Sequence, residues 1–89
     1  MSTNQPAFDA SRLIPGRIYQ VKVPFLDYDS NLHPVGERWS FIKNSFLPYE
    51  DGLTTWIEMD GRQSSFRLQW REETQGAIID HFSDYVEAL

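Results

Sequence analysis

"LTTWIEMDGRQSSFRLQW", residues 53–70, decides the fold of this chain. Its first half, 53–59, is rich in β-branched and aromatic residues, which suit the pleated surface of a sheet. In its second half Phe66, Leu68 and Trp70 recur at every second position, so we expect a strand with all three side chains buried. Asp60-Gly61 joins the halves, and this dipeptide favours a type I′ turn because glycine adopts positive φ at no steric cost. The stretch therefore predicts a β-hairpin.

Two further strands are predicted before the hairpin. Residues 17–25 and 37–42 alternate between apolar and polar side chains, which is typical of half-buried strands. Between them, residues 26–36 are rich in Asp, Asn and Ser and close with Pro and Gly, so we expect a long loop. Lys43-Asn44 is expected to bend or bulge the second strand.

The period of the sequence changes after Trp70. Apolar residues then recur at helical spacing and predict one helix from about Thr74 to Ala88: Ile78, Ile79, Phe82, Tyr85, Val86 and Leu89. Residues 1–12 are polar and are expected to form a flexible lead-in to a single domain over residues 13–89. The expected class is mainly β (α+β): a small SH3-like barrel, or a curved antiparallel sheet of four or five strands, with a C-terminal helix.

Composition fits one small soluble domain. The chain has 89 residues, of which 15% are aromatic, enough large side chains for a core. It has no cysteine, which excludes disulfides and thiolate sites and favours a reducing compartment, so we expect a cytoplasmic protein. No segment approaches the roughly 20 apolar residues of a membrane span, and the N-terminus lacks the pattern of a signal peptide.

The net charge of −5 is unevenly distributed. Residues 1–71 hold all eight Lys and Arg and eight of the thirteen acids, so residues 72–89 carry the whole excess. A neutral body lacks the clustered cations that nucleic acids or anionic membranes require, and we expect neither as a partner. The acidic segment does allow one alternative function, an inhibitor or immunity-type protein that neutralises a basic partner by electrostatic steering.

Glu50-Asp51-Gly52 is the stretch most like a motif. Adjacent side chains of a strand point to opposite faces, so these two carboxylates converge poorly as an acid–base or metal-binding pair. A type I turn over Tyr49 to Gly52, with Gly52 in the left-handed conformation as a bulge, explains the sequence better.

Asp27, Asp29 and Asn31 resemble the start of a calcium-binding EF-hand loop. The required glycine is replaced by Leu32, and the bidentate glutamate by Arg38, so local Asx-turn chemistry explains these residues better than calcium does.

A metal-dependent enzyme built on Asp27, Asp29 and His33 is a third alternative. His81 has no triad partner, because Ser83 at i+2 faces away on a helix. Neither a nucleophile elbow nor a phosphate-binding loop is present, so we expect no enzyme and no cofactor.

Aromatic side chains are the remaining candidates for function. Trp56 is out of phase with the apolar residues of its strand, so either it is exposed or the helix covers it. An exposed Trp is a good anchor in a protein interface. We therefore expect a non-enzymatic protein-binding module that uses the 26–36 loop, the 50–52 turn and Trp56. Its candidate binding residues are Tyr28, His33, Trp56 and Tyr49, and its oligomeric state stays open.

Two resemblances follow from these stretches. "LDYDS" at 26–30 with "RWSF" at 38–41 resembles the "ALYDY … LSF" pattern of SH3 domains. This resemblance implies an SH3-like barrel, and no binding residues are carried over from it. "HPVGERWSFIKNSFLPYEDGLTTWI" at 33–57, then "FRLQW" and "QGAIIDHFSDY", resembles a small bacterial family known only as a domain of unknown function. The matching positions are His33 to Glu37, Trp39, Phe41, Phe46 to Tyr49, Asp51 to Thr54, Leu68 and Gln69. This resemblance implies a bacterial protein with the family's fold, and it implies no activity.

Overall fold

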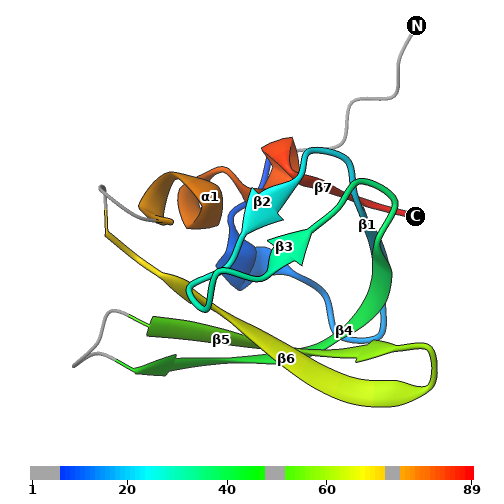
Figure 1. Cartoon of the computed structure of the whole chain (residues 1–89). Coiled ribbons are helices and arrows are strands. Elements are labelled where there is room, and N and C mark those ends of the chain that lie inside the picture. Colours follow the sequence, from blue (N-terminus) through cyan, green and yellow to red (C-terminus); the bar gives the residue numbers. More distant parts are fainter. Residues whose placement is uncertain (1–6, 48–51, 72–74) are drawn as a thin grey trace, which may run out of the picture.

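A computed structural model of the chain describes residues 7–47, 52–71 and 75–89. Figure 1 labels its main elements. In chain order they are η1 (Ala10–Arg12), β1 (Ile18–Val21), β2 (Phe25–Leu26), β3 (Leu32–His33), β4 (Arg38–Leu47), β5 (Gly52–Met59), β6 (Arg62–Gln69), α1 (Gly76–Asp80), η3 (Phe82–Asp84) and β7 (Val86–Ala88).

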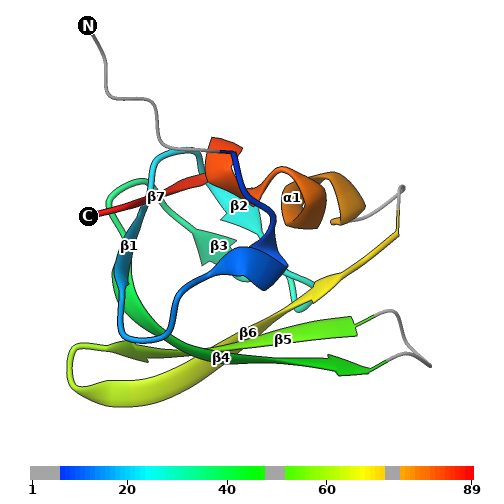
Figure 2. The ribbon, with the colours of Figure 1, turned by 180° about the vertical axis from the view of Figure 1, so that it is seen from behind.

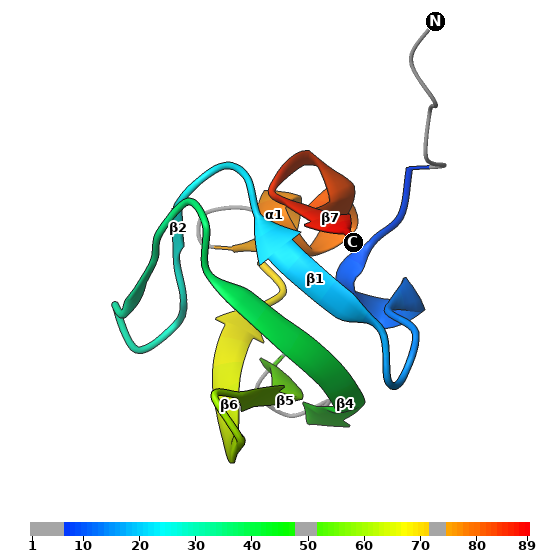
Figure 3. The same cartoon turned by 90° about the vertical axis from the view of Figure 1, so that its right-hand side faces the viewer.

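Five of the strands form one antiparallel sheet in the order β6-β5-β4-β1-β7, and β2 and β3 form a separate two-stranded ribbon. The main sheet is curved, and Figure 3 shows the ribbon beside β4 on one side of the molecule and the blue turn η1 beside β1 on the other. The mainly β class and the antiparallel sheet are confirmed. The barrel alternative is wrong, because β6 and β7 lie at opposite edges of the sheet and do not pair with each other.

The predicted hairpin is present. Met59 pairs with Arg62, and Asp60 and Gly61 between them have φ of 54° and 77°, the positive values that a type I′ turn requires. The predicted irregularity near Lys43 is also present, because the register of β4 against β5 shifts between Phe41 and Lys43. This bulge changes which side chains of β4 face the core.

The core lies on the concave side of the sheet. Trp39 has its ring centroid 5.7 Å from those of both Tyr19 and Phe66, and Phe25 continues the aromatic chain to Phe82 at 5.7 Å. Leu68, Ile79, Phe82 and Val86 have no exposed surface. The four segments after β5 thus all contribute to one core.

Trp70 is exposed, so the prediction that it is buried is wrong. Strand β6 ends at Gln69, and the Trp70 side chain keeps 41% of its surface exposed. Its ring packs edge-on against Phe46 at 5.9 Å, and its Nε1 donates a hydrogen bond to Asp80 Oδ1 at 2.9 Å. Alternation does not predict burial at Trp70 because β6 ends at Gln69, whereas the alternating pattern of the sequence continues one residue further.

The single C-terminal helix predicted over 74–88 is also wrong. Helix α1 ends at Asp80, and His81 has φ −123° and ψ 43°, outside the helical range. The chain continues as η3 and then as β7, in which Val86 pairs with Val21 of β1. Strand pairing satisfies the backbone of the sheet edge, which a longer helix would leave open. Three short elements in succession, α1, η3 and β7, carry the regularly spaced apolar residues into the core.

Residues 7–12, within the expected lead-in, pack against the domain. Ala10 is fully buried, and its carbonyl accepts a hydrogen bond from Asn44 Nδ2 at 2.8 Å. Phe8 exchanges two hydrogen bonds with Ser83, one through its N–H and one through its carbonyl, both at 3.0 Å. The blue turn in Figure 2, η1, lies over the concave face. Residues 1–6 lie outside the described part.

None of the helices in the described ranges has the length and apolar character needed to cross a membrane.

Candidate functional site

The β2–β3 ribbon has one buried and one exposed face. Phe25 pairs with His33 and Leu26 pairs with Leu32. Phe25 and His33 point into the protein, whereas Leu26 and Leu32 are 53% and 59% exposed. Five of the eleven large exposed apolar residues in the described part lie in this short region: Val23, Leu26, Tyr28, Leu32 and Val35. We call these five the ribbon surface.

His33 lies between two carboxylates beneath the ribbon surface. Its Nε2 is 2.9 Å from Asp27 Oδ2, and its Nδ1 is 2.6 Å from Glu37 Oε1. His33 is 7% exposed and Asp27 3%. The imidazole stacks on Phe25 at 4.7 Å between centroids and contacts Phe66 at 4.6 Å. The result is a buried Asp27–His33–Glu37 network.

Both ring nitrogens of His33 face carboxylate oxygens, an arrangement that favours the doubly protonated imidazolium ring, which can donate an N–H to each. Burial, the largest single influence, acts to lower the pKa of His33. The hydrogen bonds and charges of Glu37 and Asp27 act in the opposite direction, and the pKa is raised above its ordinary value. The network therefore carries one cation between two anions.

The carboxylate of Asp27 also stabilises the loop between β2 and β3. Its Oδ1 accepts hydrogen bonds from the backbone N–H groups of Asp29 at 2.9 Å and Asn31 at 3.0 Å. Ser30, between them, has φ of 65°. This geometry confirms the Asx-turn interpretation of the loop. Asp27 thus fixes both the ribbon's loop and the histidine beneath it.

The metal site expected from Asp27, Asp29 and His33 is not assembled in the described part of the chain. Asp29 does not join His33, because its carboxylate binds Arg67 Nη2 at 2.6 Å instead. That pair lowers the pKa of Asp29 through the hydrogen bond to Arg67. Within residues 7–47, 52–71 and 75–89, no group of three or more His, Asp or Glu side chains is arranged to hold a metal ion. The arrangement can position the ribbon and can respond to pH.

We expect the free energy of unfolding to fall as pH rises through the folded-state pKa of His33. The folded-state pKa of His33 is raised above 6.5, its ordinary value. The contribution of the network is therefore fully present below about pH 6.5 and is lost as pH rises through the folded pKa. Urea unfolding across pH 6 to 9 measures this change, and His81→Ala, which removes the chain's exposed histidine, should leave it intact.

A titration of His33 by proton NMR tests the same prediction without a variant. His33 should titrate above 6.5, the ordinary value of a histidine. An unfolding free energy that stays level across this range, or a His33 that titrates below that ordinary value, would contradict the assignment.

The other candidate residues lie outside this network. Tyr28 is exposed, its ring lies 5.4 Å from the Arg67 guanidinium, and its N–H donates to the Arg67 carbonyl at 2.7 Å. Trp56 lies on the outer face of β5 and pairs with Ser65 of β6. Thr54, two residues earlier in β5, pairs with Arg67.

Trp56 is half-buried, and the ammonium of Lys43 lies 5.8 Å from its ring. Helix α1 lies on the core side, so it does not cover Trp56 (Figure 1). Among the described residues, Trp56 Nε1 is buried with no hydrogen-bond partner. Tyr49 and the turn expected at Glu50-Asp51 lie outside the described residues.

Sequence reasoning grouped Asp27 with His33, as metal ligands, and missed Glu37. Glu37 follows a turn in which Gly36 has φ of 95° and the Glu37 N–H donates to the Pro34 carbonyl. Such a turn brings residues i and i+4 together, which is the one local signal that pointed to Glu37. Asp27 reaches His33 only because β2 and β3 pair.

Comparison with known proteins places this architecture in a family. A search of curated proteins found no match. Among solved structures, an integron cassette protein from the mobile metagenome of Vibrio cholerae superposes with a TM-score of 0.86 at 28% identity, covering 93% of each chain. A family profile described as "Domain of unknown function (DUF3601)" matches residues 3–89. The resemblance drawn from the sequence is thereby confirmed at the level of a domain of unknown function, and the chain belongs to that family.

Proposed function

We propose that this chain is a non-enzymatic protein-binding domain and that the ribbon surface is its contact surface. One observation carries the proposal: Leu26 and Leu32 lie directly opposite each other, both more than half exposed, on a ribbon whose other face is fixed by a buried charge network. We also infer a cytoplasmic location, from the absence of cysteine.

A fixed ribbon suits binding because association then costs little ordering of the contact surface. Scattered single apolar residues are normal on a protein surface, whereas a paired set in one short region marks an interaction site. The exposed Asp29–Arg67 ion pair next to Tyr28 would form part of a polar rim. The expected partner is a protein that presents an apolar surface to Leu26 and Leu32.

His33 changes its role in this proposal. It was a candidate contact residue, but its side chain is buried, so it would position the ribbon and not touch the partner. Tyr28 keeps its candidate role because it is exposed. Trp56 would belong to the contact only if the partner extends over the outer face of β5.

A photo-crosslinking residue placed at Leu32 tests the proposal in the cells that produce the protein. We expect one defined protein adduct that disappears when Leu26 is changed to Ser. The matched control places the same crosslinker at Ile18, which is 47% exposed and lies beside Leu89 on the other side of the sheet. Identical adducts from both positions, or an adduct only with a second copy of this chain, would overturn the proposal.

The salt dependence of the association rate distinguishes the acidic-inhibitor alternative from the ribbon-surface proposal. The acids of the C-terminal segment do not share a helical face, since Asp80 lies in α1, Asp84 in η3 and Glu87 in β7. An apolar ribbon contact should keep its association rate when salt is raised. A steep fall in that rate would instead favour electrostatic capture of a basic partner.

A further inference from the structure

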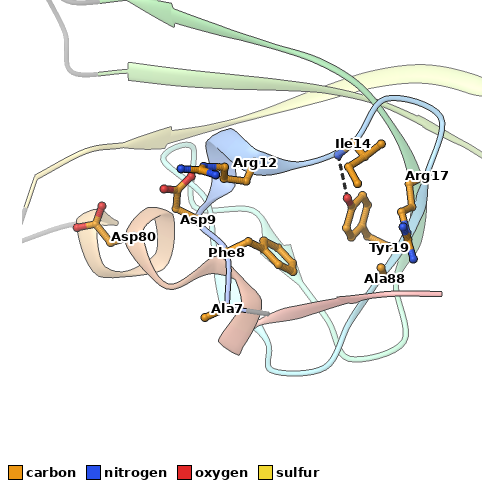
Figure 4. Close-up of a pocket in the computed structure, with 9 residues that line it drawn as sticks. All are labelled: Ala7, Phe8, Asp9, Arg12, Ile14, Arg17, Tyr19, Asp80 and Ala88. Carbon is orange, nitrogen blue, oxygen red and sulfur yellow. Dashed lines mark hydrogen bonds between the residues drawn. The ribbon is translucent and has the colours of Figure 1, made fainter. Parts of the chain in front are cut away.

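A groove separate from the ribbon surface runs along β1, between the N-terminal segment and β7. Its volume is about 590 Å³, within the range of small-ligand sites. Figure 4 shows the side chains that line it. Apolar groups from Phe8, Tyr19, Ile14 and Ala88 form its middle and one end. The small Ala88 side chain lies beside Tyr19, because these two residues pair between β7 and β1.

Opposite charges occupy the two ends of this groove. Asp80 lies at one end with Asp9 and Arg12, and Arg17 lies at the other end beside Tyr19 (Figure 4). The first end therefore carries a net negative charge and the second a positive one. Neither arginine forms an ion pair within the described part of the chain.

The acidic end keeps free hydrogen-bonding capacity. Asp80 Oδ1 accepts from Trp70 Nε1, and Asp9 Oδ1 accepts from the N–H of Ser11. The Oδ2 atoms of both carboxylates have no hydrogen-bond partner among the described residues. Two such oxygens on one side of a groove suit a ligand ammonium group.

The basic end offers the Arg17 guanidinium to an anion. Tyr19 is 3% exposed, and its hydroxyl oxygen accepts a hydrogen bond from the Ile14 N–H at 2.9 Å, so this hydroxyl is turned toward Ile14 (Figure 4). The Arg17 guanidinium lies beside the Tyr19 ring and is exposed (Figure 4). A carboxylate placed here would accept from Arg17.

We propose that this groove binds a short peptide of two or three residues as a zwitterion. Its carboxylate would meet Arg17, its ammonium group would face Asp80 and Asp9, and an apolar side chain would lie against Phe8. A simple anion would use only the Arg17 end and would face repulsion at the other. This site is independent of the ribbon surface, so either can fail alone.

Calorimetry with Ala-Phe-Ala, its C-terminal amide and its N-acetyl form tests the proposal on the whole chain. We expect the free tripeptide to bind at least about tenfold more tightly than either blocked form, since each block removes one charged contact. Arg17→Gln should abolish the preference over the amide. Asp80→Asn, whose carbonyl still accepts from Trp70, should abolish the preference over the N-acetyl form. Arg62→Gln, on β6 outside the groove, should change neither.

Amide chemical shifts locate the binding. We expect shifts at Phe8 and Tyr19 and none at Leu26 or Leu32. Equal affinity for all three peptides would overturn the proposal, because the groove would then take an internal chain segment. Equal losses in Arg17→Gln and Arg62→Gln would overturn it as well, and so would absence of binding by the folded wild-type protein at millimolar peptide.

Discussion

Replacing His33 with Ala is expected to lower the free energy of unfolding by about 3–5 kcal/mol, measured by urea denaturation at pH 6. The substitution removes the cation and leaves Asp27 and Glu37 with an unpaired charge beneath the ribbon. It also empties the space between Phe25 and Phe66. Asp27 keeps its hydrogen bonds from the N–H groups of Asp29 and Asn31, and Glu37 keeps one from Trp39 Nε1. Both carboxylates lose their link through the His33 ring, and removing one partner of a buried ion network is costly.

Two variants separate the charge from the packing. His33→Phe keeps an aromatic ring in the stack but supplies no N–H donor, so it should also be strongly destabilised. His81→Ala removes an exposed histidine and should change stability by no more than about 0.5 kcal/mol. A His33→Phe protein as stable as the wild type would show that the network contributes packing alone.

Replacing Gly76 with Ala is expected to destabilise the protein by about 1–3 kcal/mol, the usual cost of overpacking. A Cβ at this position would lie 2.6 Å from the Arg71 carbonyl oxygen, which is backbone and cannot move aside. The Gly76 N–H donates to that same carbonyl at 2.8 Å, so the close approach is part of the chain's return from β6 to α1.

Helix propensity predicts the opposite sign at this position. In an unhindered helix, Ala is more favourable than Gly by about 1 kcal/mol. The matched control is Ala77→Gly, at the next and exposed position of α1, which should cost about 0.5–1 kcal/mol through propensity. If Gly76→Ala melts at the same or a higher temperature than the wild type, the close contact with Arg71 is not present in solution.

The part of the fold that was predictable is the part set by neighbouring residues. Asp60-Gly61 fixes the β5–β6 turn, and alternation identifies the strands on both sides of it. The spacing of apolar residues alone could not decide which secondary structure the C-terminal segment forms. Ile79, Phe82 and Val86 have helical spacing, yet Val86 reaches the core from a strand because β1 needs a partner at its edge.

The candidate site was predictable only in pieces. His33 and Tyr28 were recognised as residues of interest in a polar loop, but burial reversed the role of His33 and left Tyr28 exposed. The partners of His33 come from both sides of the ribbon, and their convergence depends on the Phe25–His33 register. The sequence joined Asp27 with His33 only as a possible metal ligand, and it contained no signal for the strand pairing that brings Asp27 and Glu37 to opposite nitrogens of the ring.

The sequence by itself determined the mainly β class, the β5–β6 hairpin and the Asx turn around Asp27, because these depend on backbone preferences and on contacts within a few residues. Only the tertiary structure decided the open sheet, the division of the C-terminal segment into α1, η3 and β7, and the Asp27–His33–Glu37 network. These features satisfy the backbone groups of a sheet edge and the buried charges of the ribbon. The sheet edge depends on segments far apart in the chain, and the network depends on the β2–β3 pairing that buries His33 with Asp27.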